Sequence, residues 1–485
     1  MEKTWRASLL LPLALGLLGC SGTVRVSGQF RSTVPVIVTL QDTPPTGVTV
    51  LSFVLQITGM SLTSATPGIP SATLLEKPIS VQVQHLQTLN EFLTRALVPP
   101  ATFTSLVMTF GPTANMTIVN GSLLPVTVGG QTCAVGQVCQ LQPKLNVSSL
   151  TLASGPFPLV LADSIPVSIS LNFNLQSSIQ GDFSISPVFT LTASTAAAPN
   201  GSLVEVGGMN GVISSIGNNQ FTVLDASTGN FVPMTVNTGI TAFNNFFTCQ
   251  QGNFTCLQTG QNANIPFGIA QNTPQIFSAS SVNFVAVFTQ GFDGIITSLS
   301  PATNQFTMVV TGISPVVNGT NISGITAGEP VVVFPVSTAV FRIANGPTSV
   351  PANFTFQGFS GLAVGQHIFL NAASIGSGFP VTLTADQIVL STAQFSGSIR
   401  AIASPNLTIG QLNALFTAAG ISQMFVQTSS QTQFANLSNG FNSIGLSNTL
   451  SFGGLLFNTP AGPMLIAQQV AAPPSTPIVE SSVAR

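Results

Sequence analysis

The side chains that could carry out chemistry are few in this sequence and widely spaced. Of the 485 residues, 12 are Asp or Glu, and the closest two in sequence, Glu76 and Glu91, are 15 positions apart. One local segment therefore cannot supply a carboxylate pair or the ligands of a calcium loop. The short motifs of serine hydrolases, zinc peptidases and phosphate-binding loops are also missing. We predict a protein that is not an enzyme and needs no metal ion or cofactor; a hydrolase with distant carboxylates that converge is the alternative.

Four cysteines form two close pairs. Cys133 with Cys139, and Cys249 with Cys256, lie in segments rich in Gly, Gln and Asn. Zinc ligands usually lie two to four residues apart with His partners, and both histidines are far away in sequence. Outside the cytoplasm, such pairs indicate disulfides that close short loops. We therefore predict the disulfides Cys133–Cys139 and Cys249–Cys256.

The fifth cysteine, Cys20, ends a short N-terminal signal. Lys3 and Arg6 precede an apolar run over residues 7–18, too short to span a bilayer. The following Leu-Leu-Gly-Cys resembles the lipobox of bacterial lipoproteins, which implies cleavage of residues 1–19 and lipidation of Cys20. Two or more acyl chains give stable anchoring. We expect a lipid-anchored protein of the bacterial cell envelope that faces the periplasm or the exterior; an ordinary signal peptide is the alternative.

The histidines and two aspartates fit structural roles. His85 is expected to be a polar strand-end residue, with a general base as the alternative. His367 alternates with apolar neighbours and is expected to face solvent. Asp42, beside two prolines, and Asp293, before a glycine, are predicted to form turns.

The composition excludes one class of partner. Only 5% of the residues are charged, against roughly 25% in an ordinary domain. Cleavage at Cys20 would leave 8 basic and 11 acidic residues, a formal charge of −3, and neither Trp nor Tyr. Phe243, Phe341 and Phe434 at repeated positions could form a stacking platform for single-stranded nucleic acid. Without a basic groove we expect packing instead, and no nucleic-acid partner.

Alternating apolar residues predict an all-β N-terminal domain over residues 30–198, after a tether at 20–29. One segment differs. Leucines and Phe92 over residues 86–97 share a helical face, and Glu91 with Arg95 makes an i,i+4 pair before Pro99. This pattern predicts one helix inserted among the strands.

Three repeats follow the first domain. Gly211, Gly294 and Gly397 each open a Gly-x-Ile strand, a second strand follows, and a third ends in Thr, one or two residues, then Phe. The spacing suits three small domains, at 207–290, 291–393 and 394–472. Strands of this length with glycine at bends indicate small barrels or sandwiches. Residues 473–485 are expected to be a disordered tail.

Taken together, these motifs resemble a group of bacterial lipoproteins of unknown function. The resemblance rests on Asp42-Thr-Pro44, on the leucine-rich segment that ends at Pro99, and on the Gly-x-Ile repeats. It implies an all-β fold: an N-terminal β-sandwich with one inserted helix, then three small β-barrel or OB-like repeat domains. It transfers no active site. We expect a structural or adhesive protein with a partner in the envelope or at the surface; the alternative is a module that binds an apolar small molecule or a glycan.

Overall fold

The computed structural model describes most of the chain and has two short helices in that part, α1 (Leu175–Ser178) and α2 (Ala414–Ala418). All other regular elements there are strands and short 3-10 turns, so the predicted all-β class is confirmed. The described residues are 33–43, 49–83, 91–128, 130–163, 165, 167–195, 203–225, 231–236, 241–244, 253–270, 277–279, 281–285, 290–314, 323–344 and 350–472.

Two sheets that share one core form the N-terminal β-sandwich. The smaller sheet has the order β14-β13-β1-β5, with β1 (Val34–Thr43), β5 (Glu91–Val98), β13 (Val167–Asn174) and β14 (Phe189–Thr195). The larger has the order β10-β7-β2-β6-β11, with β2 (Thr49–Ser64), β6 (Thr102–Phe110), β7 (Asn115–Val119), β10 (Val138–Leu141) and β11 (Ser149–Leu152). Short strands add to it: β3 (Ala72–Leu75), β4 (Ile79–Gln82) and β12 (Leu159–Val160), while β8 (Val126–Val128) and β9 (Gln131–Cys133) pair separately.

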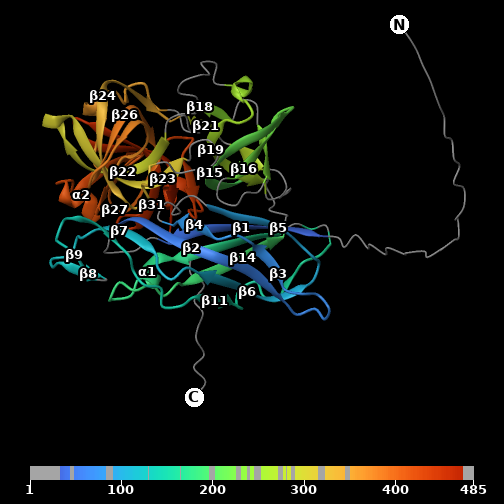
Figure 1. The fold of residues 1–485 in the computed structure, drawn as a ribbon. Coiled ribbons are helices and arrows are strands. Elements are labelled where there is room, and N and C mark those ends of the chain that lie inside the picture. Colours follow the sequence, from blue (N-terminus) through green and yellow to red (C-terminus); the bar gives the residue numbers. More distant parts are fainter. Residues whose placement is uncertain are drawn as a thin grey trace, which may run out of the picture.

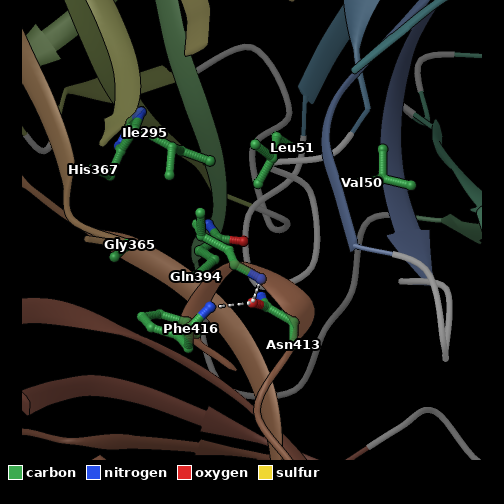
Figure 2. A pocket seen from close by; sticks show the side chains of 10 residues that line it. Val50, Leu51, Ile295, Gly365, His367, Gln394, Asn413 and Phe416 are labelled. Atoms are coloured by element: carbon green, nitrogen blue, oxygen red, sulfur yellow. Dashed lines mark hydrogen bonds between the residues drawn. The ribbon is translucent and has the colours of Figure 1, made fainter. Parts of the chain in front are cut away.

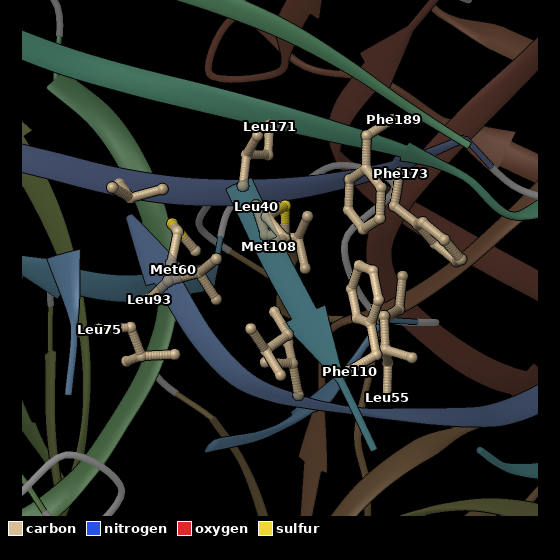
Figure 3. Packing of buried hydrophobic residues seen from close by; sticks show 14 of the residues in the cluster. Leu40, Leu55, Met60, Leu75, Leu93, Met108, Phe110, Leu171, Phe173 and Phe189 are labelled. Carbon is tan, nitrogen blue, oxygen red and sulfur yellow. The ribbon is translucent and has the colours of Figure 1, made fainter. Parts of the chain in front are cut away.

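Phenylalanine rings from both sheets fill the sandwich core. Burial alternates residue by residue along β13, as expected for a strand with one core face. Ring centroids are 5.7 Å apart for Phe53 and Phe173, and 4.8 Å apart for Phe173 and Phe189. Phe110 stacks on Phe189 from the opposite sheet (Figure 3). Each such ring contributes about 2–3 kcal/mol when removed from water, so this cluster is a main source of the sandwich's stability.

The predicted helix over residues 86–97 is wrong where the structure describes it. Residues 91–98 are strand β5, which pairs with β1; residues 84–90 lie outside the described part. The reason is burial on both faces. Leu93 packs into the sandwich core, whereas Phe92 packs into the next domain, with its ring 5.7 Å from that of Phe277. Consecutive buried residues remove the alternation that marks a strand with one wet face.

Three five-stranded barrels follow, each with the strand order 1-2-3-5-4-1. Barrel 1 contains β15 (Leu203–Gly217), β16 (Gln220–Asp225), β17 (Phe231–Val236), β18 (Ala242–Asn244), β19 (Asn262–Ala270), β20 (Phe277–Ala279) and β21 (Ser281–Val285). Barrel 2 contains β22 (Gln290–Ser300), β23 (Gln305–Ser314), β24 (Pro330–Ile343), β25 (His367–Gly376) and β26 (Val381–Ser391). Barrel 3 contains β27 (Ala393–Ala403), β28 (Asn406–Gly410), β29 (Gln423–Gln427), β30 (Gln433–Ala435), β31 (Thr449–Thr459) and β32 (Gly462–Ala471).

The pairing pattern identifies these barrels as OB-like. In each barrel the third strand runs parallel to the fifth, and the first strand pairs with both the second and the fourth, which closes the ring. Three barrel strands are interrupted and appear as two elements each: β17 with β18, β20 with β21, and β29 with β30. The expected OB-like repeats are therefore confirmed.

The repeated glycines stand where strand 1 lies close against strand 2. A Cβ at Gly211 would lie 2.5 Å from the Leu224 carbonyl oxygen, and one at Gly294 would lie 2.7 Å from that of Val309. In every barrel the register then shifts two residues later, at Ile213, Ile296 and Ile399. The sequence repeat therefore encodes the same bulged, bent first strand three times.

The repeated phenylalanines also have one structural role. Phe243, Phe341 and Phe434 near the end of the third strand each make an edge-to-face contact with a phenylalanine from the segment before strand 4. Their partners are Phe254, Phe356 and Phe441. These pairs lie in or against the barrel cores, which bears out the prediction of packing.

Residues from three domains meet in one small apolar cluster. This junction cluster contains Leu51 and Val119 of the sandwich, Val309 of barrel 2 and Leu415 of barrel 3. In Figure 1 the sandwich lies below, with barrel 1 above it on one side and barrels 2 and 3 on the other. Around the cluster the Thr117 hydroxyl donates to the Gly328 carbonyl, and the backbone N–H of residue 414 donates to the Thr49 hydroxyl at 2.7 Å.

Gly365 makes a close approach of barrel 2 to barrel 3 possible. It has φ +87°, and an added Cβ would lie 2.2 Å from the Phe416 ring. We expect Gly365→Ala to lower the free energy of unfolding by about 1–3 kcal/mol more than Gly420→Ala. Gly420 has a similar φ, +78°, with nothing within 4 Å, so it carries the backbone strain without the clash. Equal losses in urea unfolding followed by circular dichroism would contradict this contact.

Candidate functional site

One predicted disulfide is confirmed. Cys133 and Cys139 are bonded, with their Cα atoms 5.7 Å apart. Cys256 is also disulfide-bonded. Its predicted partner Cys249 and the predicted lipidation site Cys20 lie outside the described residues, so the Cys249–Cys256 pairing and the lipid remain predictions.

The Cys133–Cys139 disulfide fastens a projecting finger, which we define as residues 120–139. Residues Val126–Val128 of the finger form the short strand β8. Leu123 and Leu124 precede it and are 94% and 72% exposed. The Asn120 side-chain amide holds this turn by donating to the carbonyls of Leu124 and Cys133 at 3.1 and 2.9 Å. The finger is therefore a braced hairpin that presents two leucines to solvent.

The structure corrects the expectation that His367 faces solvent. His85 lies outside the described residues. His367 points away from the barrel 2 core, as alternation indicates, but the sandwich and barrel 3 pack beside that outer face and leave the ring half-buried. It lines a cavity of about 30 Å³ with Leu51, Ile295 and Phe416 (Figure 2). Alternation identifies the face of a strand that points outward; it does not reveal which domain lies over it.

Hydrogen bonds fix the protonation of the His367 ring. Nδ1 lies 3.1 Å from the carbonyl oxygen of Thr392, and Nε2 lies 3.3 Å from the Thr311 hydroxyl. A carbonyl only accepts, so Nδ1 carries the hydrogen and Nε2 accepts from Thr311. Burial lowers the pKa of His367 to about 4, against 6.5 in water, although the bond to Thr392 opposes this shift. The ring is therefore neutral at physiological pH.

Asp293 is also placed differently from the expectation. It lies within β22 and not in a turn, and it pairs across the sheet with Gly312 and Phe369. A Cβ at Gly312 would come within 3.2 Å of Asp293 Oδ2, so the glycine makes room for the carboxyl group. Burial raises the pKa of Asp293 to about 7. A carboxyl group that is half protonated near neutrality resembles a general acid.

The other predicted turn aspartate, Asp42, is buried near the end of β1. Asp182 is exposed and accepts hydrogen bonds from the backbone and hydroxyl of Ser184, which lower its pKa. Asp386 has a pKa raised by burial. These carboxyl groups lie on separate elements, in agreement with their spacing in the sequence.

The described part of the chain brings together no cluster of metal-ligating side chains. Within those residues, no group of three or more His, Cys, Asp or Glu could hold a metal ion. The cavity at the junction, about 30 Å³, has room for one or two water molecules and not for a substrate. None of the helices in the described part of the chain is long and apolar enough to cross a membrane. The notable polar group is therefore the half-buried imidazole of His367 between the domains.

We expect Asp293→Asn to stabilise the protein at high pH. Below pH 3.8 the carboxyl group is protonated in both the folded and the unfolded state. Between pH 3.8 and about 7 only the unfolded state ionises, so stability is lost through this window. The variant should match the wild type at pH 3.5 and exceed it by on the order of 2–4 kcal/mol at pH 8 in urea unfolding. Asp182→Asn, at an exposed carboxylate, is the control and should give no gain; a gain at pH 3.5 equal to that at pH 8 would refute the burial argument.

Comparison with known proteins identifies no family and no function for this chain. No protein-family model matches the chain, and no curated protein matches it significantly. The resemblance to bacterial lipoproteins therefore remains a prediction from the residues that carry it, and function has to be argued from the chain itself.

Proposed function

We propose that this protein is a lipid-anchored, extracytoplasmic structural or adhesive protein without catalytic activity. The observation that carries the proposal is the finger, a disulfide-fastened hairpin with two exposed leucines. No charged residue occurs between Arg95 and Lys144, so the finger and its flanks are neutral. A contact made by such a surface depends on apolar burial and not on charge.

The position of the finger supports an outward-facing role. Val34, at the start of β1, pairs with Val98 at the end of β5. The next strand, β6, begins beside the end of β2, so Val34 lies at that end of the sandwich. Val119, just before the finger, pairs instead with Thr49 at the start of β2. β2 has 16 residues, which corresponds to about 50 Å. An anchor at Cys20 would therefore attach to one end of the sandwich while the leucines project from the other.

The alternative, a module that binds an apolar small molecule or a glycan, has less support. Small-molecule sites usually enclose about 300–1,000 Å³. The junction cavity is an order of magnitude smaller, at about 30 Å³. A mature chain without Trp or Tyr also lacks the rings on which sugars usually stack. The partner that we propose is an uncharged, apolar surface of another envelope or cell-surface protein.

The anchor is tested by Cys20→Ala. We expect the wild-type protein in the membrane fraction of the producing cells and the variant in the soluble fraction, with the mobility shift of lost acyl chains. Cys133→Ser, at a disulfide cysteine, is the control and should stay with the membrane. Retention of Cys20→Ala in the membrane fraction with unchanged mobility would refute lipidation.

The adhesive role is tested by Leu123→Ser/Leu124→Ser. We expect cells that display this variant to lose most of their attachment to neighbouring cells under flow, because the apolar contact is removed. Leu446→Ser, at a leucine of barrel 3 that is 63% exposed, should keep wild-type attachment. Wild-type attachment should persist in 0.5 M NaCl, because screening does not weaken an uncharged contact. Attachment that survives the double substitution, or disappears in salt, would argue against this contact.

A further inference from the structure

Loops from both sheets form the end of the sandwich at which the described chain begins. Val34 pairs with Val98 at this end, and β13, which runs parallel to β1, begins there too. The loop after β2 joins them, because the backbone N–H of Ala65 donates to the Thr102 carbonyl at 2.9 Å. In Figure 1 this end lies at the right, beyond the labels of β3 and β5, and the finger strands β8 and β9 lie at the left. We call it the base and define it as residues 64–71, 97–102, 160–163 and 165.

The base exposes aliphatic side chains across the width of the sandwich. Leu97 belongs to the smaller sheet and Val160 to the larger one, and each is 60% exposed. Ile165, which is 45% exposed, lies in the loop that leads from the larger sheet to the smaller. Small apolar residues of the same loops are exposed as well: Ala65, Pro67, Pro70 and Ala162. Apolar side chains distributed in this way suit a broad, flat partner.

Charge is almost absent from the base. Asp163 is the single ionisable residue among those that define it, and Arg95, two positions before Leu97, is half-buried. The opposite end of the sandwich, where β6 and β13 end, exposes both Lys144 and Asp182. Proteins that bind anionic lipid or nucleic acid use clusters of Lys and Arg. A neutral, apolar end is instead suited to an uncharged interface, such as that of zwitterionic phospholipid.

The backbone of the base already has hydrogen-bond partners. The Thr66 hydroxyl accepts from the N–H of Thr102 at 3.0 Å, and the Thr66 carbonyl accepts from the N–H of Ile69 at 3.1 Å. The N–H of Leu161 donates to the Ala101 carbonyl at 2.9 Å. Four further positions are prolines, which have no N–H: Pro67, Pro70, Pro99 and Pro100. Contact with lipid would therefore dehydrate few unpaired donors, which is the main obstacle to placing loops in an apolar interface.

The proposed anchor would bring this same end to a membrane. Twelve residues lie between Cys20 and Thr33, where the described chain begins, a length that extends to at most about 40 Å. Acyl chains on Cys20 would therefore keep the base close to the bilayer. A tethered contact forms at a high effective concentration, so it needs little affinity of its own.

We propose that the base is a membrane-seating surface: it rests in the headgroup layer of the bilayer that holds the acyl chains, with Leu97, Val160 and Ile165 against lipid. The sandwich then stands on its base, and the finger points away from the membrane. This inference rests on the proposed lipid anchor and adds a second, non-covalent contact to it.

Single tryptophans make the contact measurable, because the mature chain contains neither Trp nor Tyr. Lipidated Val160→Trp protein is reconstituted into phosphatidylcholine vesicles whose acyl chains carry bromine, which quenches Trp fluorescence. We expect its emission to be at least about twofold weaker than in vesicles without bromine, since Trp in contact with a bilayer settles at the interface. Leu446→Trp, at a barrel 3 side chain that is 63% exposed, is the matched control and should be unaffected.

Acyl mass and flotation with the vesicles, recorded on the same samples, separate the two proposals. A protein without the acyl mass would contradict the lipid anchor and the seating with it. An acylated protein that floats while Val160→Trp stays unquenched would overturn the seating alone. Equal quenching of Leu446→Trp would show a molecule that lies on its side, and blue-shifted emission without quenching would show that protein, such as a second copy, covers the base; either result would overturn the proposal.

Charged substitutions test the aliphatic side chains themselves. Ile165→Trp reports from the loop, and Leu97→Asp together with Val160→Asp should lower its quenching at least about twofold, because carboxylates resist transfer into lipid. Leu446→Asp should leave this quenching unchanged. Leu97 and Val160 are exposed, so the circular dichroism of the variant should match that of the parent. Quenching that persists in full with both aspartates present would count against the seating.

Discussion

The arrangement of the domains depends on apolar contact between outer surfaces of barrels that would otherwise face water. Val309 is the clearest case: it points away from the core of barrel 2, yet it is fully buried against Leu51, Val119 and Leu415. Four side chains bury too little area to align three domains alone, since each contributes only about 2 kcal/mol. The contact is made specific by the hydrogen bonds and close approaches around it, because these fail if the barrels rotate by even a small amount.

Glycine and small polar residues provide this fit. Gly328 has φ +96° and lies so close to the sandwich that an added Cβ would come within 2.9 Å of Thr117 Oγ1. Gly121, at the base of the finger, approaches Ala414 in the same manner. Thr49 and Thr117 satisfy backbone groups of the other domains at these points. A neutral hydroxyl loses far less hydration free energy on burial than a charged side chain, so a chain with few charges can bury many such contacts.

The sequence correctly predicts those features whose residues are buried inside their own domain. The Gly-x-Ile repeats and the phenylalanines Phe243, Phe341 and Phe434 reflect contacts inside one barrel, so the repeats predict them correctly. The failures occur where a second domain covers a strand. β5 was predicted as a helix, but Phe92 packs on barrel 1 and thereby removes the alternation of a strand. His367 was expected in solvent, but it lies at the junction with barrel 3 and the sandwich. Periodicity indicates which residues of a strand are buried. It does not show whether the core of the same domain or a neighbouring domain buries them.

The scarcity of charge also determines which change in solution this architecture can respond to. In most proteins a buried ionisable group has an oppositely charged partner that offsets its desolvation, and salt then modulates the pair. Here Asp293 and His367 have pKa values displaced in opposite directions, and burial is the largest cause in both cases. The proton concentration therefore acts directly on the desolvation free energy of each group. The stability of this sparsely charged fold therefore responds to pH through Asp293 and His367.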